Sequence, residues 1–196
     1  LVREPDAPEG YAHADERVGG LSALATLEIT STPLCTLPAA LLGGLPQLRE
    51  LRLPRNALLA LPPALFATAD SLQVLDLSHN QLRTLPPSLV RLPRLEVLHA
   101  ASNELCSLPE LGCLAGLKTL NLTANRLAAL PEGLPTTLSV LHAADNQLTA
   151  LPASLGLCAV LSELDISQNA LAALPPEIAD CAKLKTLKCV STATVC

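Results

Sequence analysis

The sequence of 196 residues contains almost no aromatic side chains, with one Phe, one Tyr and no Trp, and it has no Met. A compact globular core uses aromatic rings to fill irregular volumes. This chain has 47 Leu instead, so its core must be built from units of one size. Such a composition favours a stack of similar layers over a single irregular core. It also excludes a disordered chain, because a sequence this rich in leucine buries too much apolar surface.

Long apolar runs and an excess of basic residues are also missing. No stretch approaches the ~18 uninterrupted apolar residues of a membrane helix, because Pro or a polar residue interrupts every few positions. The formal net charge is −5, so the chain lacks the basic surface that binds nucleic acid or anionic lipid. We therefore expect neither a membrane span nor a nucleic-acid partner.

A segment that starts with Leu and ends with Asn recurs along the chain. Its copies are LRELRLPRN from Leu48, LQVLDLSHN from Leu72, LEVLHAASN from Leu95, LKTLNLTAN from Leu117, LSVLHAADN from Leu138 and LSELDISQN from Leu161. Successive Asn residues are 24, 23, 22, 21 and 23 positions apart. A copy from Leu24 has Thr32 in the place of Asn, and a truncated copy starts at Leu184, which gives eight repeats.

The L-x-L at the centre of each copy alternates as in a β-strand, so its two leucines point inward and the residue between them points outward. Strands that recur every 21–24 residues can pair in parallel, about 4.8 Å apart. Each repeat has an apolar side that only its neighbours can bury, as in a solenoid. The Leu-Pro after each strand fixes a backbone torsion and removes a donor, so the return path should be extended or form short helical turns.

The pattern L-x-x-L-x-L-x-x-N-x-L-x-x-L-P resembles the leucine-rich repeat family over roughly residues 21–190. The LPxxL form is similar to intracellular repeats such as Ras-signalling scaffolds and Ras-suppressor-like proteins. The resemblance implies an α/β fold, a right-handed horseshoe solenoid with a parallel β-sheet on its concave face and extended or short helical segments on its convex face. It also implies an internal asparagine ladder made of Asn56, Asn80, Asn103, Asn125, Asn146 and Asn169.

The chain divides into three expected segments. Residues 1–20 carry a net charge of −3 and several Pro and Gly, which predicts a flexible acidic N-terminal segment. Residues 21–190 form the repeat domain, with atypical first and last repeats. Residues 191–196 form a C-terminal tail without an amphipathic capping helix, so the last repeat should expose apolar surface and a strand edge. We therefore expect that the natural chain continues or that a partner covers this end.

The outward side chains of the strands form the candidate binding site. One column of them holds Glu28, Arg52, Asp76, His99, Asn121, His142, Asp165 and Lys188. Beside it runs another that begins with Thr30 and Pro54, and beyond that lies a third column that begins with Ser31 and Arg55. The columns predict a concave surface for a protein partner, although a solvated sheet face with weakly interacting charges remains the alternative. Because no aromatic side chain lies in them, Arg52 and Arg55 are the best candidates to hold a partner's carboxylates in a polar, salt-sensitive contact.

The same residues do not favour catalysis or metal binding. Asp76, Ser78 and His79 have the residue types of a hydrolytic triad, but alternate residues of one flat strand cannot converge. His99 and His142 are two strand spacings apart, roughly 10 Å, and no third metal ligand is evident. We therefore expect no enzyme activity, no metal, no cofactor and no small-molecule substrate.

The seven cysteines do not have the spacing of a zinc site. Cys35 and Cys106 are three repeats apart, roughly 15 Å, which is too far for a disulfide. Cys158 and Cys181 replace leucines at the same place in successive repeats, so we expect them to be buried as small apolar residues. A bridge between these two remains conceivable. The unpaired use of thiols favours a reducing compartment and hence a cytoplasmic protein.

The sequence therefore predicts a non-catalytic protein-interaction scaffold that binds its partner on the concave face. Two alternatives stay open. One is a recognition module of a secreted or cell-surface receptor. The glycosylation sequon Asn121-Leu122-Thr123 favours this alternative, but its place inside a strand is more consistent with coincidence. The other is the targeting domain of a larger enzyme, such as a kinase or ubiquitin ligase, whose catalytic region lies outside this chain.

Overall fold

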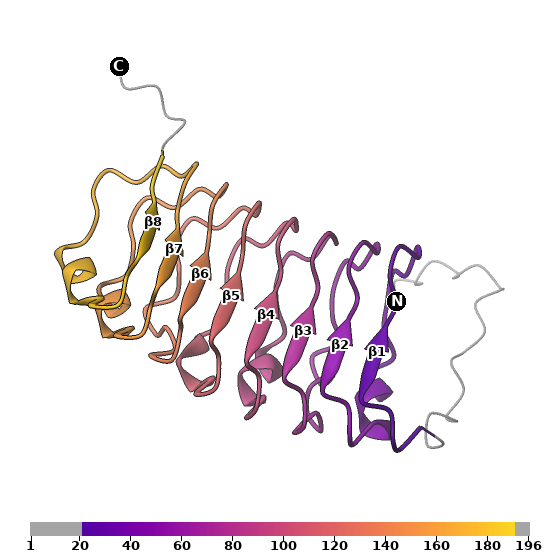
Figure 1. Ribbon diagram of the computed structural model, residues 1–196. Helices are drawn as coiled ribbons and strands as arrows, with labels where there is room; N and C mark the ends of the chain where they lie inside the picture. Colours follow the sequence, from indigo (N-terminus) through magenta and orange to yellow (C-terminus); the bar gives the residue numbers. More distant parts are fainter. Residues whose placement is uncertain (1–20, 191–196) are drawn as a thin grey trace, which may run out of the picture.

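The computed structural model describes residues 21–190, so the expected flexible segment 1–20 and the tail 191–196 lie outside the described residues. Eight short strands follow the eight repeats: β1 (Thr26–Glu28), β2 (Glu50–Arg52), β3 (Val74–Asp76), β4 (Val97–His99), β5 (Thr119–Asn121), β6 (Val140–His142), β7 (Glu163–Asp165) and β8 (Thr186–Lys188). Each strand pairs in parallel with the next one along the chain, and together they form one open sheet (Figure 1). The predicted α/β solenoid is confirmed.

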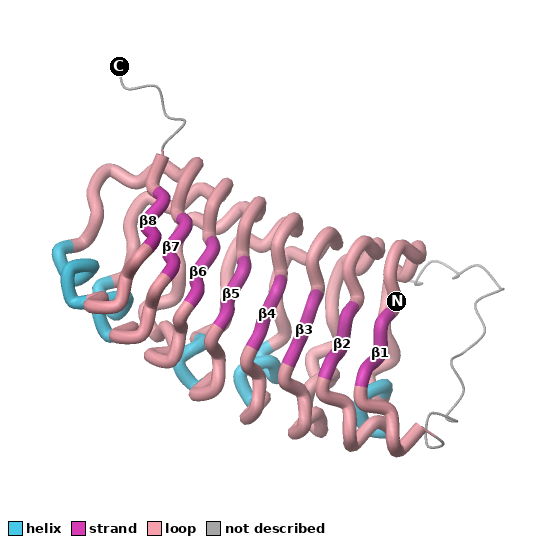
Figure 2. The backbone as a smooth tube through the Cα atoms, viewed as in Figure 1, coloured by secondary structure: helices cyan, strands magenta, loops and turns pink. Residues whose placement is uncertain are grey.

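Short 3₁₀ helices lie on the return path between strands. They are η2 (Leu41–Gly44), η3 (Pro87–Arg91), η4 (Leu111–Cys113), η5 (Ala153–Leu157) and η6 (Pro176–Asp180). Figure 2 shows them following one another on the side of the coil away from the strands. Both η3 and η6 begin with Pro at the first helical position, after a second Pro in extended conformation. Proline therefore marks where these helices start, since its fixed φ and missing N–H are tolerated at the first helical position, and the return path forms the short helical turns that were predicted.

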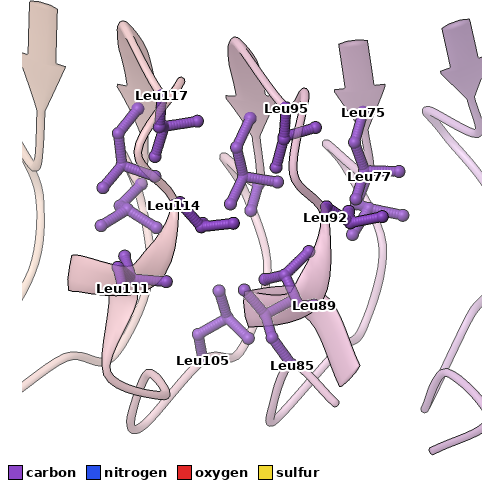
Figure 3. Close-up of a cluster of buried hydrophobic side chains, with 14 of the residues drawn as sticks. Leu75, Leu77, Leu85, Leu89, Leu92, Leu95, Leu105, Leu111, Leu114 and Leu117 are labelled. Atoms are coloured by element: carbon purple, nitrogen blue, oxygen red, sulfur yellow. The ribbon is translucent and has the colours of Figure 1, made fainter. Parts of the chain in front are cut away.

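The core is a stack of leucines contributed by every repeat. The central leucine of an inner strand, such as Leu75 on β3 or Leu98 on β4, has no solvent exposure. Figure 3 shows Leu89 on η3 and Leu111 on η4 on one side of this interior, with Leu95 and Leu117, which precede β4 and β5, on the other. Each fully buried leucine contributes about 1.5–3 kcal/mol through the removal of apolar surface from water. Because this surface is buried between neighbouring repeats, no single repeat could retain the fold alone.

The asparagine that ends each repeated segment connects one repeat to the preceding one. The Asn103 side-chain amide donates to the Leu77 carbonyl of the preceding repeat at 3.0 Å and to the Ala100 carbonyl of its own repeat at 3.2 Å. The Asn103 side-chain oxygen accepts from the Leu82 amide at 3.0 Å. Equivalent contacts are made by Asn56, Asn80, Asn125, Asn146 and Asn169. The asparagine ladder implied by the family resemblance is therefore present.

The residue before each ladder asparagine, and before Thr32 in the first repeat, adopts a left-handed backbone conformation. These residues have φ between 54° and 56°: Ser31, Arg55, His79, Ser102, Ala124, Asp145 and Gln168. The sequence prediction grouped them as a third column of the strand face, whereas the structure places them in a turn at the end of the strand. The turn brings the Arg55 amide to the Ser78 carbonyl at 3.0 Å and the His79 amide to the Ala101 carbonyl at 2.8 Å. These bonds to the next repeat offset the cost of a positive φ in residues other than glycine.

Two cysteines occupy buried positions on the inside of neighbouring repeats, as predicted. Cys158 has no solvent exposure and Cys181 has 4%. Both are free thiols, and each donates to a carbonyl of the preceding repeat, Cys158 to Pro135 at 3.4 Å and Cys181 to Leu155 at 3.3 Å. Burial, followed by the nearby Cys181 thiol, raises the pKa of Cys158 to about 11. Burial and the Asp180 carboxylate also raise the pKa of Cys181.

Replacing a ladder asparagine should destabilise the solenoid more than replacing an outward one. Asn103→Ala leaves the Leu82 amide without its buried acceptor and removes one of the two side-chain donors to the Leu77 carbonyl, so we expect a loss of about 1–3 kcal/mol in the free energy of unfolding. Asn121→Ala removes one acceptor on the half-buried strand face and should cost less than about 1 kcal/mol. Denaturant titration measures both, and equal losses would contradict the assigned register.

The buried thiols should react slowly with alkylating reagents. Because the pKa of Cys158 is raised to about 11, only a trace of its thiolate exists near neutral pH, and the thiolate is the reactive form. Mass spectrometry after timed iodoacetamide treatment should find the exposed Cys106 and Cys113 modified first. Cys158 and Cys181 should follow only after denaturation. Rapid modification of Cys158 in the folded protein would show that this layer opens to solvent.

Candidate recognition surface

The predicted column of outward residues forms a single row across the sheet. Cross-strand pairing joins Glu28 to Arg52, Arg52 to Asp76, and so on through the remaining strands to Asp165 and Lys188. We call this row the second column; it consists of Glu28, Arg52, Asp76, His99, Asn121, His142, Asp165 and Lys188. The structure therefore brings together eight of the nine site residues predicted from the sequence. The ninth, Arg55, lies exposed in the left-handed turn after β2.

A parallel row of outward residues was missed by the sequence analysis. It begins each strand, two positions before the second column, and therefore faces the same side of the sheet. We call it the first column; it consists of Thr26, Glu50, Val74, Val97, Thr119, Val140, Glu163 and Thr186. Extending the alternation of the L-x-L pattern by one step toward the N-terminus would have found it. The repeated β-branched residues at this position were the available signal.

Charged side chains of the two columns pair locally near the N-terminal end of the sheet. The Arg52 guanidinium donates from Nε and Nη2 to the Glu50 carboxylate, at 3.2 and 3.0 Å. This contact engages two donors of the fork that was expected to hold a partner's carboxylate. Both side chains remain more than one-third exposed, so the pair contributes little to stability but fixes the direction of the guanidinium.

Three side chains of the second column accept a hydrogen bond from the backbone two residues further on. Asp76 accepts from the Ser78 amide at 2.9 Å, Asn121 from the Thr123 amide at 3.1 Å, and Asp165 from the Ser167 amide at 3.1 Å. Each bond satisfies an amide at the end of a strand and orients the side chain on the open face. Asp76, Ser78 and His79 do not form a hydrolytic triad, because the Asp76 oxygen contacts the Ser78 backbone amide and His79 lies in the turn.

A second charged group lies at the C-terminal end of the sheet. The Lys188 ammonium is 3.4 Å from Asp165 and 3.8 Å from Glu163, and His142 Nε2 is 3.2 Å from Glu163. Burial tends to raise the pKa of Asp165, but hydrogen bonds from Ser167 and the Lys188 ammonium lower it below its ordinary value. Asp165 therefore stays ionised near neutral pH, and one lysine is shared by two carboxylates.

The last repeat exposes apolar side chains, as expected from the sequence. Val190 is 74% exposed, and Leu174 and Leu187 are each 38% exposed. Strand β8 is the last strand of the sheet, so its outer edge has no neighbour among residues 21–190.

Over the same residues, no group of three or more His, Cys, Asp or Glu side chains is arranged to hold a metal ion. No helix in this part of the chain is long and apolar enough to cross a membrane.

Comparison with known proteins agrees with this geometry. A family model described as leucine rich repeat matches residues 46–105. The chain is similar to a leucine-rich repeat protein of Leptospira interrogans, with 29% identity and a TM-score of 0.68, over 90% of this chain and 51% of that one. It is also similar to the PEPR1–AtPEP1 structure, with 29% identity and a TM-score of 0.71, over 87% of this chain and 28% of that one.

A third similarity, to the leucine-rich repeat domain of APL1B, shows the shared fold alone, with 20% identity and a TM-score of 0.74 over 90% of this chain and 59% of that one. The chain thus spans 51% of the Leptospira protein and a smaller share of the PEPR1 structure. No curated protein matches its sequence. Together with the eight parallel strands and the asparagine ladder, the family match over residues 46–105 and the solved structures show that residues 21–190 have the leucine-rich repeat fold.

Proposed function

We propose that this chain is a non-catalytic scaffold that binds a protein partner on its concave face. The observation that carries the proposal is the contrast between the two sides of the strands. The inward positions are nearly all leucine, whereas the first and second columns contain acidic, basic, amide, imidazole and β-branched side chains in register. Repeat folds use such variable outward positions to form extended binding surfaces.

The proposed contact residues are those of the two columns together with Arg55. The second column supplies Glu28, Arg52, Asp76, His99, Asn121, His142, Asp165 and Lys188. Eight strands at about 4.8 Å spacing present these side chains over roughly 34 Å, which is long enough to contact a folded domain or an extended segment. The partner is a protein and not a nucleic acid, because a face with net negative charge repels phosphate.

A reducing compartment, such as the cytoplasm, is the proposed location. The Cys158 and Cys181 thiols lie within the core and donate hydrogen bonds, which a disulfide cannot do. Unpaired, buried thiols are typical of proteins that fold under reducing conditions. A role in signalling follows from the resemblance of the LPxxL repeats to intracellular scaffolds, and the partner would define the pathway.

Site-specific photo-crosslinking tests which face binds the partner. Benzoylphenylalanine replaces His99 or Asn121 on the concave face, and the purified protein is irradiated in an extract of its native source. We expect the same partner to be crosslinked from both positions and identified by mass spectrometry, because both side chains lie at the middle of the face. Circular dichroism of each variant checks that the fold is retained.

The matched control places the same amino acid at Arg91 or Leu157, which are exposed at the ends of η3 and η5 on the opposite side of the coil. These positions should give no specific product. If the partner is crosslinked from Arg91 or Leu157 and not from the concave face, the binding surface is the convex side. If no position of the folded protein yields a protein product, the scaffold function is wrong.

A further inference from the structure

The first column is uncharged and mostly apolar at the centre of the concave face. Val74, Val97, Thr119 and Val140 occupy the first column on four consecutive strands, and all four are half-buried. Four strands at about 4.8 Å spacing place their methyl groups along a stripe of roughly 14 Å. Beyond the second column, the third outward position of these strands is small, with Ser78, Ala101, Thr123 and Ala144, so the large side chains beside the stripe are those of the second column.

Negative charge is concentrated on the same face. The first and second columns together hold five acidic and two basic side chains, a net charge of −3. The other residues between 21 and 190 hold eight acidic and nine basic side chains, a net charge of +1. The excess of acid over base in the repeat domain therefore lies on the concave face and not on the rest of the surface.

The two basic side chains of these columns are engaged by their own neighbours. Arg52 contacts Glu50 at 3.0 Å, and Lys188 lies between Asp165 and Glu163 at 3.4 and 3.8 Å. Asp76 has no basic partner among the described residues, and the two carboxylates on β7 share one lysine. Uncompensated negative charge thus lies on either side of the apolar stripe, at β3 and at β7.

The spacing of these charges defines what can bind them. Strands β3 and β7 are four strand spacings apart, roughly 19 Å. An extended chain rises about 3.3 Å per residue, so two side chains about six residues apart span this distance. A segment that crosses the strands in this way would lay its intervening residues along the valine stripe. The side chains at its ends should be positively charged, because a cation is attracted to the Asp76 carboxylate and to the two carboxylates that share Lys188.

We propose that the concave face binds an extended, cationic protein segment with Lys or Arg at two positions about six residues apart and apolar residues between them. One basic side chain contacts Asp76 on β3, the other contacts Glu163 and Asp165 on β7, and the apolar residues lie on Val74, Val97 and Val140. This inference rests on the proposed function, since it names the partner chemistry for the same face. It assigns recognition to the carboxylates, whereas the sequence had favoured Arg52 and Arg55.

Selection from a displayed library of random short peptides tests the proposal directly. The immobilised full chain should enrich peptides with two basic residues at the stated spacing and aliphatic residues between them. The best synthetic peptide is then titrated by fluorescence anisotropy. The double variant Asp76→Asn with Glu163→Gln should weaken its binding about tenfold, because both charged contacts lose their attraction. Val97→Thr, which keeps the shape of the side chain, should weaken binding severalfold without changing the salt dependence.

The control variant combines Asp70→Asn with Glu132→Gln, two exposed acidic residues outside the concave columns. It removes the same charge as the double variant and should leave the affinity of the peptide unchanged. An equal loss in the control variant would mean that only overall charge matters and would overturn the proposal. So would enrichment of acidic peptides, enrichment without basic residues, or no enrichment at all.

Three further outcomes distinguish a failure of this inference from a failure of the proposed function. If photo-crosslinking captures a protein from His99 and Asn121 but the library yields no cationic peptide, the scaffold function stands and the partner chemistry is wrong. If sedimentation shows that the chain self-associates and that Asp76→Asn abolishes this, the occupant is a second copy, which overturns the cationic segment. Crosslinking from the convex positions alone overturns both.

Discussion

The whole structure depends on how the backbone polar groups inside the coil are satisfied. Each repeat forms one coil of the solenoid. The tight turn at the end of its strand would bury backbone amides and carbonyls that have no partner in a helix or sheet. The asparagine side chain solves this problem because it has a donor and an acceptor on one short arm. It accepts from an amide of the preceding repeat and donates to a carbonyl of that repeat, as Asn103 does with Leu82 and Leu77. The repeats are thereby held in one register.

That register turns a repeated sequence into a surface. Once Asn103 is fixed against the preceding repeat, the residue four positions earlier, His99, must lie beside Asp76 and Asn121. The same constraint imposes the positive φ at Ser102, because the chain must bend sharply to bring the asparagine inside. The proposed binding face is therefore positioned by bonds on the opposite side of the backbone, within the core.

Sequence reasoning predicted the solenoid fold and most of the strand register because the inward positions repeat almost without change. It placed Asp76 and His99 in one row, and it placed Cys158 and Cys181 in the core. It did not find the left-handed turn, since Arg55, Ala124 and the other residues there share no chemical type that signals a positive φ. It also could not find the contact between Arg52 and Glu50, which depends on side-chain torsions and on a column that the consensus pattern leaves unspecified.

The separation between inward and outward positions explains why the charge of the concave face is informative. Stability is supplied by leucines and asparagines that point inward, so an outward residue such as Val97 or Asp165 is free to vary without affecting the core. A fold that needs only a solvated face could place polar residues at Val74, Val97 and Val140. β-Branched side chains favour strands, so the fold accounts for part of the row of Val74, Val97, Thr119 and Val140. Strand preference does not account for the carboxylates beside this row on β3 and beyond it on β7. The proposed contact with a partner of complementary chemistry accounts for both features.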